Sequence, residues 1–118
     1  MLKVYAYKNC STCQKALKHL KARGVAYQEI PIREQPPGLE ELKRMLKIQG
    51  GRLASLFNTS GRDYQEMSLK DKLPGMAVEK ALELLAGNGN LVKRPFALQG
   101  GVGAVGFKPE EWDRLFSR

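Results

Sequence analysis

The sequence lacks any long apolar stretch. Nowhere do about 18 apolar residues follow one another, as a membrane span requires, and the opening MLKVYAYKNC contains no apolar core of the kind found in secretion signals. No segment is biased enough in composition to indicate disorder. These absences predict a folded cytoplasmic protein with no membrane partner.

Cysteine, histidine and tryptophan are scarce: the chain has two, one and one of them. Cys10 and Cys13 are too close in sequence for a bridge between them to brace the fold, so a structural disulfide framework is disfavoured. In a reducing compartment such a pair is more often catalytic, redox-sensing or metal-binding. A structural zinc site needs about four ligands, and only His19, expected to be solvated on the polar side of a helix, accompanies the pair. We expect no metal and no bound cofactor.

Positive charge exceeds negative charge, with 20 Lys and Arg against 12 Asp and Glu and a net charge of +8. Such a balance attracts polyanions. The basic residues are spread along the whole chain, however, and no helix-turn-helix, zinc-finger or RNA-binding signature accompanies them. The composition therefore predicts a generally basic surface rather than specific nucleic-acid binding, on a protein expected to be a monomer.

Apolar periodicity predicts alternating strands and helices in the first third of the chain. Residues 2–7 and 25–32 have the β-branched and aromatic character of strands. Apolar residues at helical spacing mark residues 13–20, which end before Gly24, and residues 39–46, which follow two prolines. Two strands joined by one helix pair in parallel.

The rest of the chain predicts helices followed by a hairpin. Residues 50–90 carry an interrupted helical pattern, which we interpret as an insertion. Phe96–Leu98 and Val102–Phe107 bracket a Gln-Gly-Gly turn, which is typical of a β-hairpin, and Pro109 opens a last helix. The expected fold is a single α/β domain over residues 1–118, ordered βαβ and then ββα around a mixed four-stranded sheet.

The motif Cys10-Ser11-Thr12-Cys13 stands between the first predicted strand and the first predicted helix. Unpaired N–H groups and the helix dipole favour an anion at a helix N-terminus, so Cys10 is the expected nucleophilic thiolate. Cys13 lies one turn further on and is the expected resolving thiol, although its place on the apolar stripe also suits a buried structural residue. Lys8 adds positive charge near Cys10 and, with Ser11 and Thr12, completes the predicted substrate site at this turn.

Several short motifs together resemble one known family. They are KNCSTCQKA at residues 8–16, Asn58-Thr59 with Gly61 and Tyr64, Lys93-Arg94-Pro95, and Val105-Gly106-Phe107. The first resembles a Spx-type C-x-x-C, the second the N-T-x-G segment of YffB-like proteins, and the third the family's R-P pair. In this order, the motifs make the whole chain similar to the ArsC, Spx and YffB-like branch of the thioredoxin superfamily. The resemblance implies a thioredoxin-like fold.

The resemblance also implies roles for residues far from the cysteines. Pro95 is expected to follow a cis peptide bond and to face the cysteines, with the backbone of Arg94 free to pair with a disulfide substrate. The Arg94 side chain would suit a thiolate, a carboxylate of glutathione or an oxyanion. The arsenate reductases of this family carry further arginines and a histidine at positions that correspond here to Asn58, Ala104 or Val105, and Ala6. Asn58 remains a predicted substrate contact, but arsenate reduction is disfavoured.

Two functions therefore remain. The first is a thiol–disulfide oxidoreductase, linked to glutathione or thioredoxin, that acts on glutathione or on a protein disulfide. The alternative is a Spx-like regulator, in which a Cys10–Cys13 disulfide controls binding to RNA polymerase. Gly50 and Gly51 lie near the point where such regulators carry a contact glycine, although glycines there also end a helix.

A glycine pattern near the end of the chain is misleading. Residues 101–106 match G-x-G-x-x-G, the dinucleotide fingerprint. That fingerprint joins a first strand to a helix, whereas here it falls on a predicted strand near the end of the chain. We expect no nucleotide at this segment.

Overall fold

A mixed sheet forms the centre of the computed structural model, which describes residues 1–117. Its strands are β1 (Leu2–Ala6), β2 (Tyr27–Pro31), β3 (Phe96–Gln99) and β4 (Val102–Val105), in the order β2-β1-β3-β4. β1 pairs parallel with β2 and antiparallel with β3, and β3 pairs antiparallel with β4. The parallel pair and the hairpin predicted from the sequence are both confirmed.

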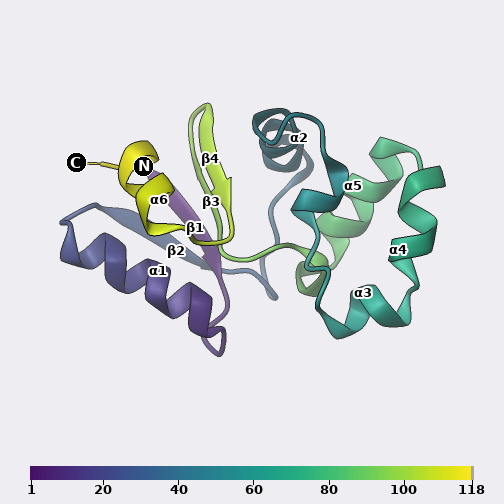
Figure 1. The fold of residues 1–118 in the computed structure, drawn as a ribbon, viewed down its shortest axis with the longest axis horizontal. Coiled ribbons are helices and arrows are strands. Elements are labelled where there is room, and N and C mark those ends of the chain that lie inside the picture. Colours follow the sequence, from purple (N-terminus) through teal and green to yellow (C-terminus); the bar gives the residue numbers. More distant parts are fainter. Residues whose placement is uncertain (118) are drawn as a thin grey trace.

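Helices cover both faces of the sheet (Figure 1). On one face lie α1 (Ser11–Ala22) and α6 (Pro109–Leu115), whose apolar residues share a core with Leu2, Val4 and Ala6. On the other face lie α2 (Leu39–Ile48) and α5 (Val78–Gly87), which share a core with Tyr5. Successive side chains of a strand point to opposite faces, so β1 contributes to both cores. This three-layer α/β arrangement is a thioredoxin-like fold.

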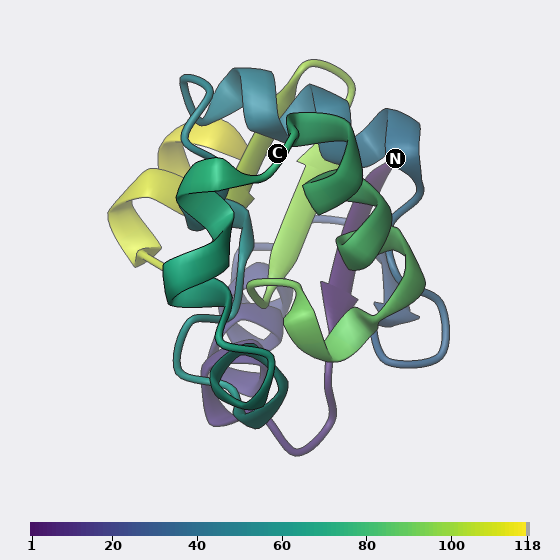
Figure 2. The same ribbon diagram turned by 90° about the vertical axis from the view of Figure 1, so that its right-hand side faces the viewer.

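The predicted insertion is a series of short helices that ends against the β2–α2 loop. Before α5 come η1 (Leu53–Leu56), α3 (Arg62–Glu66), α4 (Leu69–Lys72) and η2 (Leu73–Gly75), and after it comes η3 (Gly89–Leu91). Figure 2, which looks onto the insertion, shows these helices in front of the sheet. A Cβ at Gly89 would lie 1.9 Å from the carbonyl oxygen of Ile32, so only glycine allows this close approach.

Helix and strand ends follow local backbone geometry. Gly24, with φ of +67°, follows the C-cap of α1, as the sequence predicts. The second hairpin strand, predicted to reach Phe107, ends at Val105 because Gly106 has φ of +76° and leaves the extended region.

The prediction that His19 is solvated is wrong. Only 10% of its side chain is exposed, because α6 packs over the C-terminal half of α1. His19 Nε2 lies 2.8 Å from Asp113 Oδ1, and the ring packs edge-on against Phe107. Arg23 also pairs with Asp113, so this polar cluster joins the first helix to the last.

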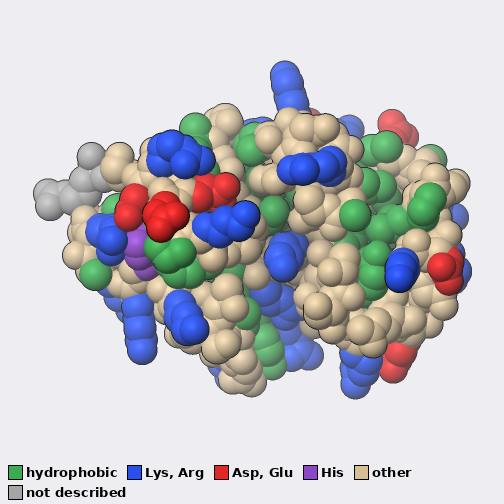
Figure 3. All heavy atoms as spheres, viewed as in Figure 1, with side chains coloured by type: hydrophobic (Ala, Val, Ile, Leu, Met, Phe, Trp, Pro, Cys, Tyr) green, Lys and Arg blue, Asp and Glu red, His purple; other side chains and the backbone are tan. Residues whose placement is uncertain are grey.

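On the face shown in Figure 3, basic side chains are spread over the surface. Figure 3 shows Lys and Arg on both the sheet layer and the insertion. Within residues 1–117, no helix is long and apolar enough to cross a membrane.

Candidate active site

Cys10 is the N-cap residue of α1. Its backbone is extended, with φ of −95° and ψ of 113°, and its carbonyl accepts the first helical hydrogen bond from Gln14 N at 3.0 Å. Its Sγ accepts a hydrogen bond from Cys13 N at 3.3 Å. A thiolate accepts such a bond more strongly than a thiol does. The first turn of α1 contains no acidic residue, so nothing there opposes a negative charge on the Cys10 sulfur.

Cys13 lies directly beneath Cys10 and has no exposed surface. Burial raises the pKa of the Cys13 thiol from 9.0 to about 12, and a hydrogen bond with Cys10 adds to the rise. Both cysteines are free. One thiol is therefore half-buried at a helix N-terminus, and the other is an enclosed, protonated neighbour.

Arg94 lies just before β3 and is joined to Pro95 by a cis peptide bond, as the resemblance implied. Its guanidinium is half-buried and donates from Nη2 to the carbonyl oxygen of Asn90 at 3.0 Å. Its Nε is buried without a hydrogen-bond partner. The positive charge of Arg94 acts to lower the pKa of Cys13, against the stronger effect of burial.

Tyr7, which the sequence indicated only as the end of a strand, connects Arg94 to the cysteine loop. The Arg33 guanidinium lies 4.8 Å from its ring centroid and that of Arg94 lies 5.7 Å away, both within cation–π range. Its hydroxyl accepts hydrogen bonds from Arg33 at 2.8 Å and Asn9 at 3.1 Å. The bond from Asn9 and the charge of Arg33 lower the pKa of Tyr7. The tyrosine and Arg33 are 26 residues apart, so no local pattern could have paired them.

A polar pocket of about 360 Å³ lies beside Arg94. It is lined by Arg33, Asn58, Gly61, Arg62, Asp63, Asn90 and Arg94. Asn58 is held by a backbone bond to Leu91 O at 2.7 Å, and its carbonyl accepts from Gly61 N at 3.0 Å. A Cβ at Gly61 would lie only 2.7 Å from the Asn58 amide nitrogen, which gives a steric reason for the glycine of the N-T-x-G segment.

The structure distributes the predicted site residues over three places. Asn58 and Arg94 share the polar pocket. Lys8 lines a separate hollow of about 420 Å³ with Tyr7, Glu29 and Glu34. Ser11 and Thr12 are exposed on the first turn of α1 and line neither cavity. Arg33 and Arg62, which the sequence did not single out, join Arg94 instead.

Comparison with known proteins decides the family. The family profile described as ArsC family matches residues 5–115. The chain belongs to the ArsC family. The uncharacterized protein YusI of Bacillus subtilis (strain 168) is 46% identical over 112 residues, which are 95% of each chain.

Two further proteins that are similar to this chain carry different functional names. A solved structure described as a possible arsenate reductase, from Streptococcus mutans UA159, has 37% identity and a TM-score of 0.86 over 92% of each chain. The global transcriptional regulator Spx of Enterococcus faecalis (strain ATCC 700802 / V583) is 29% identical over all of this chain and 88% of its own length. Family membership is thus compatible with an enzyme and with a regulator.

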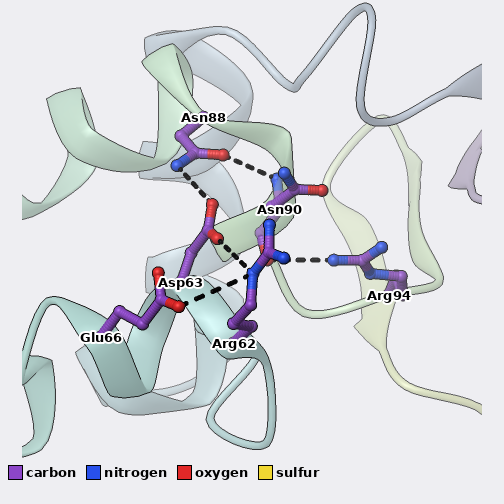
Figure 4. A network of polar contacts seen from close by, with 6 residues as sticks. All are labelled: Arg62, Asp63, Glu66, Asn88, Asn90 and Arg94. Carbon is purple, nitrogen blue, oxygen red and sulfur yellow. Dashed lines mark hydrogen bonds and ion pairs between the residues drawn. The ribbon is translucent and has the colours of Figure 1, made fainter.

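A polar network connects the elements around the pocket of about 360 Å³ (Figure 4). Asp63 accepts from Asn88 at 3.1 Å and lies 3.8 Å from Arg62, which also pairs with Glu66 at 3.9 Å. Asn88 accepts from Asn90 N at 3.0 Å. The network therefore ties α3 to η3, and the bond from Arg94 to Asn90 O extends it to β3.

Two further kinds of ligand site, for a metal ion and for a nucleotide, depend on how side chains are grouped and on where a segment lies in the chain. In the part of the chain that the structure describes, no three His, Cys, Asp or Glu side chains are grouped to hold a metal ion. The G-x-G-x-x-G segment at residues 101–106 runs from the hairpin turn through β4 and is followed by Phe107, so it does not join a first strand to a helix.

Proposed function

We propose that this ArsC-family protein is a thiol–disulfide oxidoreductase that uses Cys10 as nucleophile and Cys13 as resolving thiol. The observation that carries the proposal is the position of Cys10 Sγ at the N-cap of α1, with the buried Cys13 in direct contact. Donation from a first-turn N–H and the positive end of the helix dipole both stabilise a thiolate. Cys10 is the more exposed sulfur of the two, so an incoming disulfide would meet it first.

The reaction follows from the two environments. The Cys10 thiolate attacks one sulfur of a substrate disulfide RS–SR, forms Cys10–S–S–R and releases RS⁻. Cys13 then gives up its proton to solvent or to the departing thiolate and attacks Cys10 Sγ, which releases the second RS⁻. The substrate gains two electrons, and the enzyme ends with a Cys10–Cys13 disulfide. Two equivalents of a thiol such as glutathione, or one dithiol protein of the thioredoxin type, return it to the reduced form.

Arg94, Pro95 and Asn58 complete the proposed site. The cis Arg94–Pro95 bond precedes β3, and Arg94 lines the same pocket as Asn58. Guanidinium groups bind carboxylates in a bidentate manner. This arrangement supports glutathione, which carries carboxylates beside its thiol, as the co-substrate. Lys8, Ser11 and Thr12 are close to Cys10 in the sequence and are proposed to contact the disulfide itself.

Single cysteine variants test the proposal. Cys10→Ser is expected to abolish reduction of a small disulfide, because the remaining thiol is enclosed and protonated. Cys13→Ser is expected to keep the first attack and to accumulate the mixed disulfide, detected as a mass increase of intact protein by mass spectrometry. The double variant sets the background. Full disulfide reductase activity in Cys10→Ser would refute the mechanism.

The alternative is a regulator of the Spx type, favoured by the full-length similarity to Spx. Gly50 and Gly51 have φ of +72° and +81°, and their N–H groups bond back to Lys47 O and Leu46 O, so they also cap α2. A pull-down of RNA polymerase by the oxidised protein but not by the reduced protein would favour regulation. Its absence, together with disulfide reductase turnover, would favour the enzyme.

A further inference from the structure

We infer that a groove on the insertion, between α4, η2 and α5, binds a small amphipathic anion, namely a free carboxylate that carries one alkyl chain. The groove encloses about 480 Å³. Figure 1 shows α4 and α5 at the side of the molecule opposite α1, and neither cysteine lines the groove. The inference therefore does not depend on the proposed thiol chemistry.

The first support is apolar surface that the fold leaves uncovered. Met67, Met76 and Leu84 are only half-buried. All three pack against the core beneath α2 and α5, and all three also line the groove. Apolar groups gathered at the surface mark binding sites, whereas single exposed ones do not. Methionine side chains are flexible and polarisable, so they adapt to apolar ligands of varied shape. This lining therefore suits an alkyl chain.

The second support is free space at the connection between the two helices. Gly75, in η2, lies along the chain between Lys72 of α4 and Lys80 of α5, and all three residues line the groove. A Cβ placed on Gly75 would meet no atom within 4 Å. No neighbouring side chain occupies the space beside this residue, so a ligand can lie there without displacing part of the protein.

The third support is charge. Lys72 and Lys80 are the charged residues among those that line the groove, and the lining contains no carboxylate. Both lysines are exposed, and within residues 1–117 neither is ion-paired. A lysine lays its alkyl stem along apolar surface and keeps its ammonium group in water. Two such groups beside an apolar lining complement a ligand with an apolar chain and one negative group.

The size of the groove favours a small molecule over a protein partner or a second copy of this chain. Small-molecule sites are clefts of about 300–1,000 Å³ with a mainly apolar lining and a few polar groups. This groove has those properties. A stable protein interface takes about 20–30 residues from each partner, which is far more than line the groove.

NMR of protein labelled with ¹³C at the methionine methyl groups tests the inference at single residues. The ligand is decanoate, kept below the concentration at which it forms micelles. Of the four methionines, Met67 and Met76 line the groove and should show saturable shifts. Met45, which is buried, and Met1, which is exposed at the N-terminus, should not shift. Met67→Leu and Met76→Leu assign the two signals.

Matched variants separate space from charge. Gly75→Leu should weaken binding by at least about tenfold, because its side chain fills the apolar space. Gly101→Leu, in the hairpin turn, is the control, since a Cβ there also meets nothing within 4 Å. Lys72→Gln and Lys80→Gln should each weaken binding about threefold, as expected for exposed ion pairs. Lys70→Gln, at an exposed lysine of α4 outside the groove, should leave binding unchanged. Circular dichroism confirms that each variant is folded.

Decanol supplies the same alkyl chain without the charge and should bind more weakly than decanoate. Equal affinities would overturn the assignment to an anion. Unchanged binding in Gly75→Leu, or unsaturable shifts of all four methionine signals, would overturn the groove. Shifts of Met67 and Met76 on dilution of the unliganded protein would show that a second copy covers the groove. Shifts caused by phosphatidylglycerol vesicles but not by decanoate would show that a lipid surface does, and either result would overturn the free carboxylate as occupant.

Discussion

Cys10 and Cys13 differ in environment although they stand three residues apart. Cys10 caps the helix and keeps part of its surface exposed, whereas Cys13 is enclosed between α1 and the sheet. Burial holds the pKa of Cys13 at about 12, so this thiol stays protonated at neutral pH. Such a residue cannot compete with Cys10 for a substrate in solution. In the proposed reaction, it acts as a nucleophile only on a mixed disulfide at Cys10.

Alkylation kinetics should reveal this difference. In folded Cys10→Ser, iodoacetamide should leave Cys13 almost unmodified at pH 8, because burial, the largest cause of its raised pKa, remains in the variant. After denaturation in guanidinium chloride, the same thiol should react at an ordinary rate, because burial is the main cause of its raised pKa. Peptide mapping of the alkylated protein gives the measurement. Rapid modification of folded Cys13 at pH 8 would show that it is not enclosed.

At the scale of elements, η3 contacts both the loop after β2 and Arg94, which line the pocket. Gly89 lies against the Ile32 carbonyl, at the start of the loop that carries Arg33. The same short helix places Asn90 opposite Arg94. The end of the insertion and the loop after β2 therefore position two sides of the pocket together.

Gly89→Ala should destabilise the protein. Its Cβ would lie 1.9 Å from Ile32 O and 2.9 Å from the Arg33 Cα, and both are backbone atoms that cannot rotate away. Forced shifts of this kind cost about 1–3 kcal/mol, measurable as a lower midpoint in urea denaturation. Gly87→Ala is the matched control, because a Cβ there meets nothing within 4 Å and alanine favours a helix. Equal stability of the two variants would contradict the close approach.

At the scale of the whole molecule, two hydrophobic cores lie on opposite faces of one sheet, and a polar cluster borders the core beneath α2 and α5. Tyr5 projects from β1 into the core beneath α2, where its hydroxyl donates to Glu41, and Lys3 pairs with Glu41 at 3.2 Å. Burial, followed by the hydrogen bond and the charge of Glu41, raises the pKa of Tyr5 above its ordinary value of 10.0. The pKa values of Tyr5 and Cys13 are thus both raised, one on each face of the sheet.

Stability should therefore fall in alkali. Both groups keep their protons in the folded state after the unfolded chain has lost them, so the unfolded state binds fewer protons above about pH 9. The stabilisation is complete below pH 9 and is lost as the pH rises toward 12. Each fully titrating group contributes a slope of about −1.4 kcal/mol per pH unit.

Urea unfolding at pH 8, 9, 10 and 11 measures this slope. Tyr5→Phe should make it shallower above pH 10, whatever its effect at pH 8, whereas Tyr27→Phe, at a half-exposed tyrosine of β2, serves as control. An unchanged alkaline slope in Tyr5→Phe would rule out Tyr5 as its source.

Much of the fold could be predicted from the sequence, because its signals are local. Periodicity of apolar residues indicated the strands, α1, α2 and α6, and Gly24 indicated the end of α1, whereas the end of β4 at Gly106 was not predicted. The position of Cys10 at a helix N-terminus also followed from its neighbours. The cis bond before Pro95 was implied by the family resemblance alone.

The tertiary structure decided what the distant side chains do. His19 is covered by α6, whose Asp113 lies 94 residues further along the chain. Arg33, Arg62 and Arg94 meet in one pocket, and Tyr7 meets two of them. A sequence pattern reports which face of its own helix or strand a residue occupies. It does not report which other element will pack there, so the candidate cysteines could be picked out from the sequence, while the arginine-lined pocket was seen only in the tertiary structure.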